Sequence, residues 1–440
     1  MSSFSLTGFQ KIFKDLNHAE KKTFRLHLAY QSIEGVILGV LAMNEYVFIK
    51  SIQGSSYQVG LLFQFSVLVF IFLVLFNELR KRIENKKLVI RISGIITRLP
   101  LAGLVFFPAD PSAYASSQIY HYIFLGIFLI YYFGNIIIYP AINVMLKTNY
   151  RYDNFGKLYA YSTSANKLIM LVATFFYGLM LDKDFYVFRY VFPVMAALGI
   201  ISLYILSGIE VGKSQFVRQT QSVWNSVKLS VRGMYRIVKE NKPYRDFELG
   251  FMGYGFAFMM TSPVINIFMN EGLDLNYSSV AFYKNAYNII AIILLLFTGR
   301  WLGRMDPRKF AAYTFLSLAG YILFMMLAEY IPASLETGNI RIYLMLVLSY
   351  LSYGYFAATM VLLWNIGSAY FCKPEEADDY QSNHLFLTGV RSILAPILGV
   401  FFYEKIGFTW TFNIGIAFAV LSSAIMLHSY KKYKFDPQLF

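Results

Sequence analysis

Apolar runs of bilayer-crossing length alternate with short polar and basic segments along almost the whole chain. A transmembrane helix needs about 20 mainly apolar residues, and twelve segments meet this requirement. The segment at 88–107 is the least regular, because Arg98 and Pro100 interrupt it. We therefore expect an all-α polytopic membrane protein with twelve transmembrane helices. They are placed at 25–49, 57–76, 88–107, 119–146, 157–181, 186–208, 246–269, 279–299, 308–330, 341–369, 382–403 and 409–429.

The overall composition excludes an ordinary soluble domain. Of the 440 residues, 57% are hydrophobic and 15% are charged, whereas soluble domains are about 45–50% apolar and about 25% charged. The single cysteine, Cys372, permits neither an intrachain disulfide nor a cysteine-based metal site. The sequence contains no phosphate-binding G-x-x-x-x-G-K-S/T loop and no H-E-x-x-H metal motif. No cofactor, no metal and no ATP-driven activity are therefore expected.

The basic residues predict the orientation in the membrane. Of 39 Lys and Arg, 30 lie in the termini and in the loops that would share their side, and 5 lie in the opposite loops. The remaining 4 lie inside spans. Because cytoplasmic loops collect Lys and Arg, both termini are expected in the cytoplasm. The net charge of +14 then reflects topology and not nucleic-acid binding. Abundant Lys, Asn, Tyr and Phe suggest a bacterial protein, so the bacterial inner membrane is the expected location.

The chain divides into two six-span halves. We expect a cytoplasmic amphipathic segment at 1–24, an N-terminal half at 25–208, a basic linker helix at 209–245, a C-terminal half at 246–430 and a cytoplasmic tail at 431–440. In the first segment, Phe9, Ile12, Phe13 and Leu16 recur at helical spacing. This helix could lie on an anionic membrane surface or pack on the protein itself.

The two halves carry a repeat in the loops that follow spans two and eight. Arg82 and Arg304, Lys86 and Arg308, and Lys87 and Lys309 are each separated by 222 residues. The first spans of the two halves begin at 25 and 246, which is nearly the same separation. A duplication with the same orientation in both halves is typical of secondary transporters.

These loops resemble the signature G-x-x-x-D-R-x-G-x-R-K of the major facilitator superfamily. Gly299, Arg304, Arg308 and Lys309 match the second copy, whereas Lys81 and Gly303 replace the signature Asp. Span eleven, with His384, Thr388 and Arg391, is similar to poorly characterised bacterial members. The resemblance implies transport by alternating access and a gating role for the four matching loop residues.

Polar side chains in span one are predicted to lie on one face of the helix. At 100° per residue, Gln31, Glu34 and Glu45 fall within about 40° of the direction of His27. Glu34 could be a proton carrier, a buried structural partner of a basic residue, or a residue that contacts the substrate directly. Ionisable groups inside a bilayer usually face a cavity or one another. Arg98 is expected to snorkel towards an interface.

Other spans also place polar residues at helical spacing. Lys167 and Arg391 are 224 residues apart and could flank one cavity from the two halves. The predicted substrate and proton pathway consists of Gln31, Glu34, Tyr132, Asn135, Tyr139, Tyr161, Lys167, Tyr254, Lys284, Asn288, Tyr353, His384, Thr388 and Arg391.

The buried charges are mostly positive, which favours an anionic or amphipathic organic solute. The leading interpretation is a monomeric secondary transporter, not an enzyme, that moves a small organic molecule and is coupled to protons. A non-transporting membrane sensor or scaffold is one alternative. An intramembrane enzyme that acts on lipids is another, although no acid–base or nucleophile set assembles for it.

Overall fold

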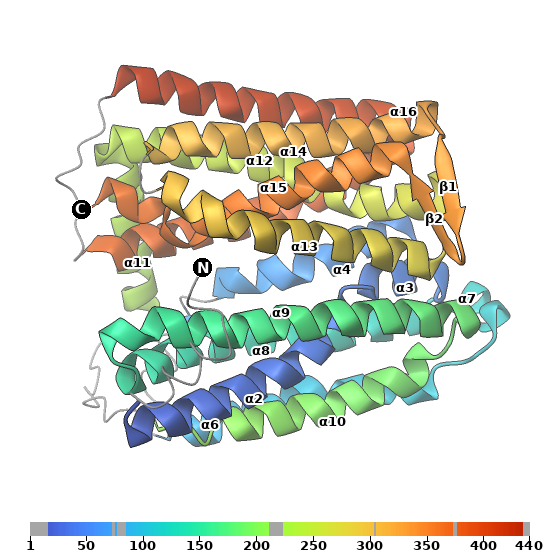
Figure 1. The fold of residues 1–440 in the computed structure, drawn as a ribbon, viewed down its shortest axis with the longest axis horizontal. Helices are drawn as coiled ribbons and strands as arrows, with labels where there is room; N and C mark the ends of the chain where they lie inside the picture. Colours follow the sequence, from blue (N-terminus) through green and yellow to red (C-terminus); the bar gives the residue numbers. More distant parts are fainter. Residues whose placement is uncertain are drawn as a thin grey trace.

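Long helices lying side by side make up most of the computed structural model, which describes residues 16–72, 75–76, 85–210, 223–302, 305–372 and 376–433 (Figure 1). The N-terminal half consists of α2 (His18–Leu41), α3 (Asn44–Lys50), α4 (Ser56–Leu68), η1 (Val69–Phe72), α6 (Lys86–Arg98), η2 (Leu99–Phe106), α7 (Pro111–Ser116), α8 (Ile119–Asn149), α9 (Tyr152–Lys183) and α10 (Phe188–Leu206). The C-terminal half consists of α12 (Lys242–Ile267), η3 (Phe268–Gly272), α13 (Tyr277–Leu302), α14 (Pro307–Tyr330), β1 (Ser334–Thr337), β2 (Ile340–Tyr343), α15 (Leu344–Ile366), η4 (Ser368–Phe371) and α16 (Ala377–Lys432).

The bundle has two distinct ends. The first residues of α2 and the last residues of α16 lie at one end, which we call the terminal end, at the left of Figure 1. Helix α11 (Val223–Glu240) lies across the bundle at this end and packs on α12 and α16. Strands β1 and β2 lie at the opposite end, which we call the hairpin end.

The β-hairpin corrects the all-α prediction. Strands β1 and β2 pair antiparallel, with Ser334 opposite Tyr343 and Thr337 opposite Ile340. Gly338 has a φ of 59° in the turn, a conformation that glycine adopts without steric cost. The pair Gly338–Asn339 between the strands is a recognisable hairpin signal, and the apolar runs on both sides obscured it.

Within the described residues, nine segments are long and apolar enough to cross a membrane. One of them, within α16, contains both of the last two predicted spans, and Gly407 separates these two with a φ of 77°. The predicted second span corresponds to the shorter apolar helix Ser56–Phe72. The fold is thus mostly helical with many candidate spans, while the count of twelve stays a prediction.

The first span differs from its prediction. Helix α2 already begins at His18, because Asn17 and Glu20 form a reciprocal capping box. It ends at Leu41, and α3 begins only at Asn44. The prediction that Glu45 shares a face with Glu34 is therefore wrong, since it assumed an unbroken helix. The amphipathic pattern from Phe9 to Phe13 lies outside the described residues.

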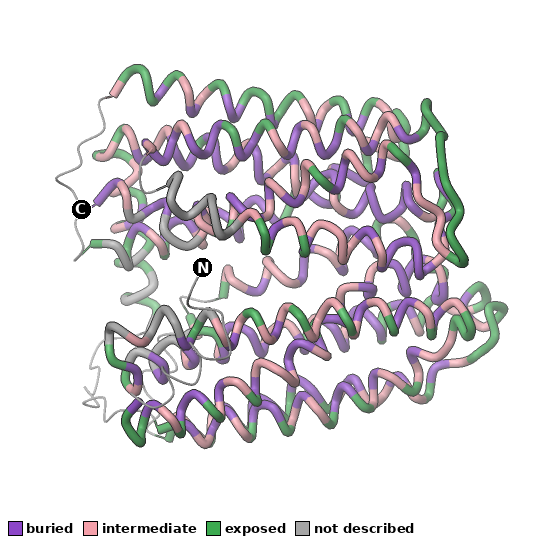
Figure 2. The backbone as a smooth tube through the Cα atoms, viewed as in Figure 1, coloured by how far each residue is buried: buried purple, intermediate pink, exposed green. Residues whose placement is uncertain are grey.

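Close helix contacts hold each half, and the two halves meet mainly along two helix pairs. Within the N-terminal half, a Cβ on Gly39 would lie 2.6 Å from the Cβ of Ala173, so α2 and α9 approach closely. Between the halves, α9 packs on α13 and α4 packs on α16. Buried residues concentrate inside the bundle (Figure 2). On α9, an outward stripe of exposed apolar side chains suits contact with lipid: Leu168, Val172, Phe176 and Met180.

Candidate substrate-binding site

A cavity of about 390 Å³ lies between the two halves. Lys167 of α9 and Arg391 of α16 line it from opposite halves, as the repeat in the sequence predicted. Its remaining wall is mostly apolar and aromatic, and includes Tyr254, Tyr353, Phe356 and Trp364. In this mostly apolar cavity, Lys167 and Arg391 can bind the charged end of an amphipathic solute, while the aromatic rings contact its apolar body.

The Arg391 side chain is held in place by α12. Its guanidinium donates a hydrogen bond to the carbonyl oxygen of Phe251 and lies 5.2 Å from the centre of the Tyr254 ring. A Cβ on Gly255 would lie 1.9 Å from the Arg391 Cζ. A glycine is therefore required here so that the guanidinium can approach the backbone of α12.

A second cavity, of about 200 Å³, continues the first towards the hairpin end. The two share Phe258, Tyr287, Asn288 and Tyr353 in their walls. The second cavity also contains Glu45 and Lys284, whose charged atoms are 3.9 Å apart.

Lys284 forms a hydrogen bond at the break in the first span, between the end of α2 and the start of α3. Its Nζ donates to the carbonyl oxygen of Ala42 at 2.6 Å, beyond the last residue of α2. An interrupted helix exposes carbonyl groups that a cation can satisfy. Lys284 of the C-terminal half therefore ties α2 and Glu45 of the N-terminal half to the cavity wall.

Glu34 lies elsewhere, inside the N-terminal half. It is buried, and Ser202 of α10 donates a hydrogen bond to its carboxylate at 2.6 Å. It does not line either of the two cavities. The Arg98 guanidinium is close enough to interact with it electrostatically. Among the predicted roles of Glu34, this arrangement favours that of a buried partner of a basic residue.

Arg98 does not snorkel, which corrects the prediction. Only 1% of the residue is exposed. Its guanidinium lies 3.8 Å from the centre of the Tyr131 ring and donates to the Tyr131 carbonyl oxygen at 3.0 Å. A cation–π contact and a nearby carboxylate together compensate its removal from water.

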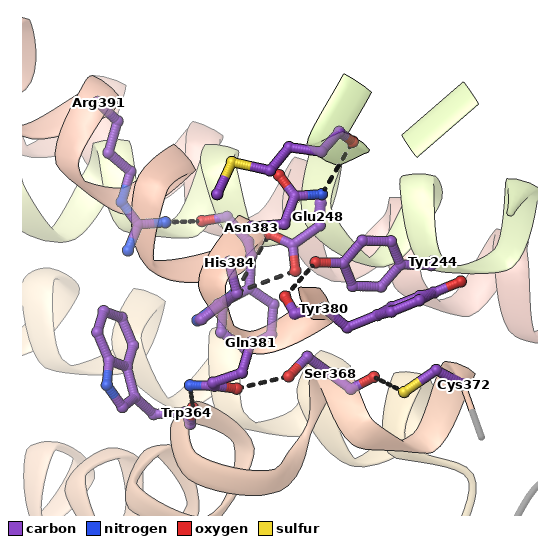
Figure 3. A network of polar contacts seen from close by, with 12 residues as sticks. Tyr244, Glu248, Trp364, Ser368, Cys372, Tyr380, Gln381, Asn383, His384 and Arg391 are labelled. Carbon is purple, nitrogen blue, oxygen red and sulfur yellow. Dashed lines mark hydrogen bonds and ion pairs between the residues drawn. The ribbon is translucent and has the colours of Figure 1, made fainter. Parts of the chain in front are cut away.

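His384 pairs with Glu248, a residue outside the predicted pathway. The His384 Nδ1 lies 3.0 and 3.2 Å from the two carboxylate oxygens of Glu248, and both residues are buried. Figure 3 shows His384 within a polar network, with Glu248 and Tyr244 on one side and Trp364 on the other. Their spacing of 136 residues hid this pair from sequence reasoning.

The cavities thus collect six of the fourteen predicted pathway residues: Lys167, Tyr254, Lys284, Asn288, Tyr353 and Arg391. Besides Glu34 and His384, six lie outside the lining of these two cavities: Gln31, Tyr132, Asn135, Tyr139, Tyr161 and Thr388. Gln31 contacts His27 at 3.3 Å, and Tyr139 stacks on Phe70 with ring centres 6.4 Å apart. Gln31 and Tyr139 thus contact other side chains of the N-terminal half.

The predicted gating loop is only partly described. Arg308 is buried and binds Asp306 with two hydrogen bonds, of 3.0 and 2.7 Å. It also donates to the Ser429 carbonyl oxygen at 2.9 Å, near the end of α16. The Lys309 Nζ lies 5.9 Å from the centre of the Tyr430 ring. These contacts stay within the C-terminal half. Of the other two loop residues, Gly299 belongs to α13 and Arg304 lies outside the described residues.

The halves are bonded to each other at the hairpin end. Asp182 of α9 accepts hydrogen bonds from the backbone N–H groups of Tyr277 (2.8 Å) and Ser278 (3.0 Å), at the start of α13. The Ser278 hydroxyl and the Asn339 amide donate to the same carboxylate. Lys50 of α3 donates to the Leu275 carbonyl oxygen at 2.7 Å. Asp182 therefore caps a helix of the other half.

Within the described residues, no cluster of three or more His, Cys, Asp or Glu side chains is arranged to hold a metal ion.

Comparison with known proteins supports the same fold. The family model of the Major Facilitator Superfamily matches residues 34–382. No curated protein matches the sequence.

Solved transporter structures are similar over almost the whole chain. The nucleoside transporter NupG is 16% identical, with a TM-score of 0.63, over 96% of this chain and 100% of that one. The peptide transporter POT in complex with sulfate is 14% identical, with a TM-score of 0.67, over 94% of both chains. The inward-open xylose transporter XylE from E. coli is 11% identical, with a TM-score of 0.62, over 94% of this chain and 95% of that one. At these identities the likeness concerns the fold. By its family match over most of its length, the chain belongs to the Major Facilitator Superfamily.

Proposed function

We propose that the protein is a secondary active transporter of small organic anions that works by alternating access. The observation that carries the proposal is the cavity between the halves, with Lys167 on one side and Arg391 on the other. A solute held by both cations would contact both halves at once. Its binding would therefore favour the arrangement of the halves in which both cations reach it.

The proposed topology has twelve spans with both termini in the cytoplasm of a bacterial cell. The terminal end then faces the cytoplasm and the hairpin end faces outward, in agreement with the 30 to 5 distribution of basic residues. The hydrogen bonds that Asp182, Lys50 and Lys284 make between the halves lie near the hairpin end or beside the cavities. This distribution supports a state that is closed to the outside.

The proposed solute carries a negative charge on an apolar, preferably aromatic body. Tyr254, Phe258, Tyr353, Phe356 and Trp364 offer ring faces and edges around the two cations. The titles of the similar structures name nucleosides, peptides and xylose, which are also organic solutes. Proton coupling is the proposed source of energy.

Counterflow in proteoliposomes tests the proposal. Purified protein is reconstituted with a panel of aromatic carboxylates and sulfonates inside, and uptake of the labelled solute is measured. We expect saturable exchange of at least one panel member, reduced at least about tenfold by Arg391→Ala or Lys167→Ala, the loss expected from one charged contact. Arg236→Ala, on the exposed face of α11, is the matched control. Folded protein that exchanges no panel member would contradict the proposal.

A further inference from the structure

Glu248 and His384 form a buried acid–base pair between α12 and α16. Glu248 is 3% exposed and His384 is 1% exposed. A carboxylate without a proton can only accept hydrogen bonds. The 3.0 Å contact therefore makes His384 Nδ1 the donor. The second ring nitrogen, Nε2, is buried and has no hydrogen-bond partner among the residues that the structure describes. That nitrogen is an available position for one proton.

The pair changes its net charge when this proton binds. Among the described residues, His384 makes the only ion pair with Glu248. With a neutral imidazole the pair carries one negative charge, and with an imidazolium it is neutral. A buried unpaired carboxylate is costly, whereas a buried hydrogen-bonded ion pair is tolerated. Proton binding at Nε2 therefore converts a buried carboxylate beside a neutral imidazole into a hydrogen-bonded ion pair.

Two residues connect the pair to the proposed solute cavity. The Phe251 ring lies edge-on to His384, with centres 4.8 Å apart, and its carbonyl oxygen accepts the hydrogen bond from Arg391. The Trp364 ring lies edge-on to His384 at 5.0 Å and lines the cavity together with Lys167 and Arg391. The pair thus contacts the Trp364 ring, which is part of the cavity wall; Figure 3 shows His384 between Glu248 and Trp364.

The Arg391 guanidinium is a permanent positive charge beside the pair, because it donates to the carbonyl oxygen of Phe251, whose ring contacts His384. Tyr244 and Tyr254 on α12 interact electrostatically with Glu248, and Tyr380 on α16 and Cys372 after η4 interact with Tyr244. Tyrosines and a thiol are ordinarily neutral near pH 7. A positive guanidinium disfavours an imidazolium nearby. An anion bound at Arg391 would cancel that repulsion.

We propose that Glu248 and His384 form the proton-binding site that couples this transporter to a proton gradient. The inference rests on the proposed function. A proton from water on the side of higher proton concentration binds His384 Nε2 while the anion binds Arg391. Both are released on the other side, and no covalent bond is formed or broken apart from the N–H bond. Each ligand strengthens the binding of the other, by the same factor in both directions. Cotransport of one proton with a monoanion is electroneutral.

A fluorescence titration tests the site without any transported solute. Trp364 is one of four tryptophans in the chain, and an imidazolium quenches a neighbouring indole. Wild-type protein in detergent should lose part of its emission as the pH falls, and Trp364→Phe should remove that component. Glu248→Gln and His384→Gln should abolish it, while Glu34→Gln should keep it. An unchanged component in both Glu248→Gln and His384→Gln overturns the proposal.

Gradient-driven uptake tests the coupling. We use the panel sulfonate with the fastest counterflow, because sulfonates stay ionised and do not cross lipid as neutral acids. One pH unit corresponds to a factor of about ten, so wild type and Glu34→Gln should concentrate the sulfonate about tenfold. Glu248→Gln should exchange it without concentrating it. Should Glu248→Gln fold poorly in size-exclusion chromatography, His384→Gln and Glu248→Asp provide the same comparison. Full accumulation by folded Glu248→Gln and His384→Gln overturns the inference, whereas absence of any wild-type counterflow overturns the proposed function instead.

Discussion

At the scale of single residues, Arg98 and Glu34 show that the tertiary environment determines the role of an ionisable side chain. An ionisable residue in an apolar segment predicts an inward-facing position, and this holds for Lys167, Lys284 and Arg391, which line the cavities. The same reasoning could not assign Glu34 to the cavity or to the interior of one half. That assignment depends on Ser202 and Arg98, which come from different helices.

Replacing Arg98 should destabilise the protein more than replacing both partners. Arg98→Gln removes the cation that interacts electrostatically with the buried Glu34 carboxylate, and a buried charge that loses its compensation destabilises the fold. The double variant Arg98→Gln/Glu34→Gln should recover part of that loss. Thermal unfolding in detergent measures both. A double variant as unstable as the sum of the single losses would argue against electrostatic pairing.

Cys372 should react slowly with maleimides. The thiol is buried and lies in the connection between α15 and α16, and burial raises the pKa of Cys372 to about 11. The thiolate is the reactive form, and it is scarce near neutral pH when the pKa is that high. Labelling should therefore accelerate as the pH is raised towards this pKa. Since the chain has one cysteine, mass spectrometry reads the rate directly, and rapid labelling at neutral pH would contradict this burial.

At the scale of elements, the break in the first span has the largest effect on the candidate site, and the sequence pattern did not predict it. Hydropathy identified the segment, but it carries no signal for a helix that stops at Leu41 and restarts at Asn44. The break places Glu45 in the cavity beside Lys284. The interhelical cap by Asp182 was equally hidden, because its partners are 95 and 96 residues away.

Replacing Asp182 should favour opening at the hairpin end. Asp182→Asn removes a charge that caps α13, and such a cap is worth about 1 kcal/mol, or roughly a fivefold population shift. Met269 lines the second cavity, so a cysteine at this position, in a Cys372→Ser background, reports access to that cavity from the hairpin end. Its labelling by an impermeant maleimide should accelerate severalfold.

Asp184→Asn is the control for this experiment. Its carboxylate accepts from the nearby Tyr186 N–H at 2.8 Å, within the N-terminal half. An equal acceleration in both variants would argue against a specific cap by Asp182.

Gly255→Ala should mimic the loss of Arg391. The new Cβ would overlap the guanidinium, so Arg391 has to leave the position that it occupies against α12. We expect solute exchange to weaken at least about tenfold, as for a lost charged contact, with little change in folding. Gly250→Ala is a matched control on the same helix, because its Cβ would meet the flexible end of Met426. Normal exchange by Gly255→Ala would mean that this position of Arg391 is dispensable.

At the scale of the whole molecule, much of the architecture was predictable. Apolar run length indicated the spans, and the repeat of Arg82 in Arg304 and of Lys87 in Lys309 indicated two halves. Lys167 and Arg391 were expected to face one cavity because of their near-equivalent positions, and both line it. The Glu248–His384 pair required tertiary structure, since its two members lie on helices far apart in the chain.

The most direct test of alternating access is a distance measurement across the hairpin end. Spin labels at Ser116 and Thr337, both exposed and in different halves, are introduced in a Cys372→Ser background, and electron–electron resonance gives their separation in lipid. We expect one short distance without solute and a second, longer population when a counterflow substrate is added. A single unchanged distance under both conditions would contradict the account.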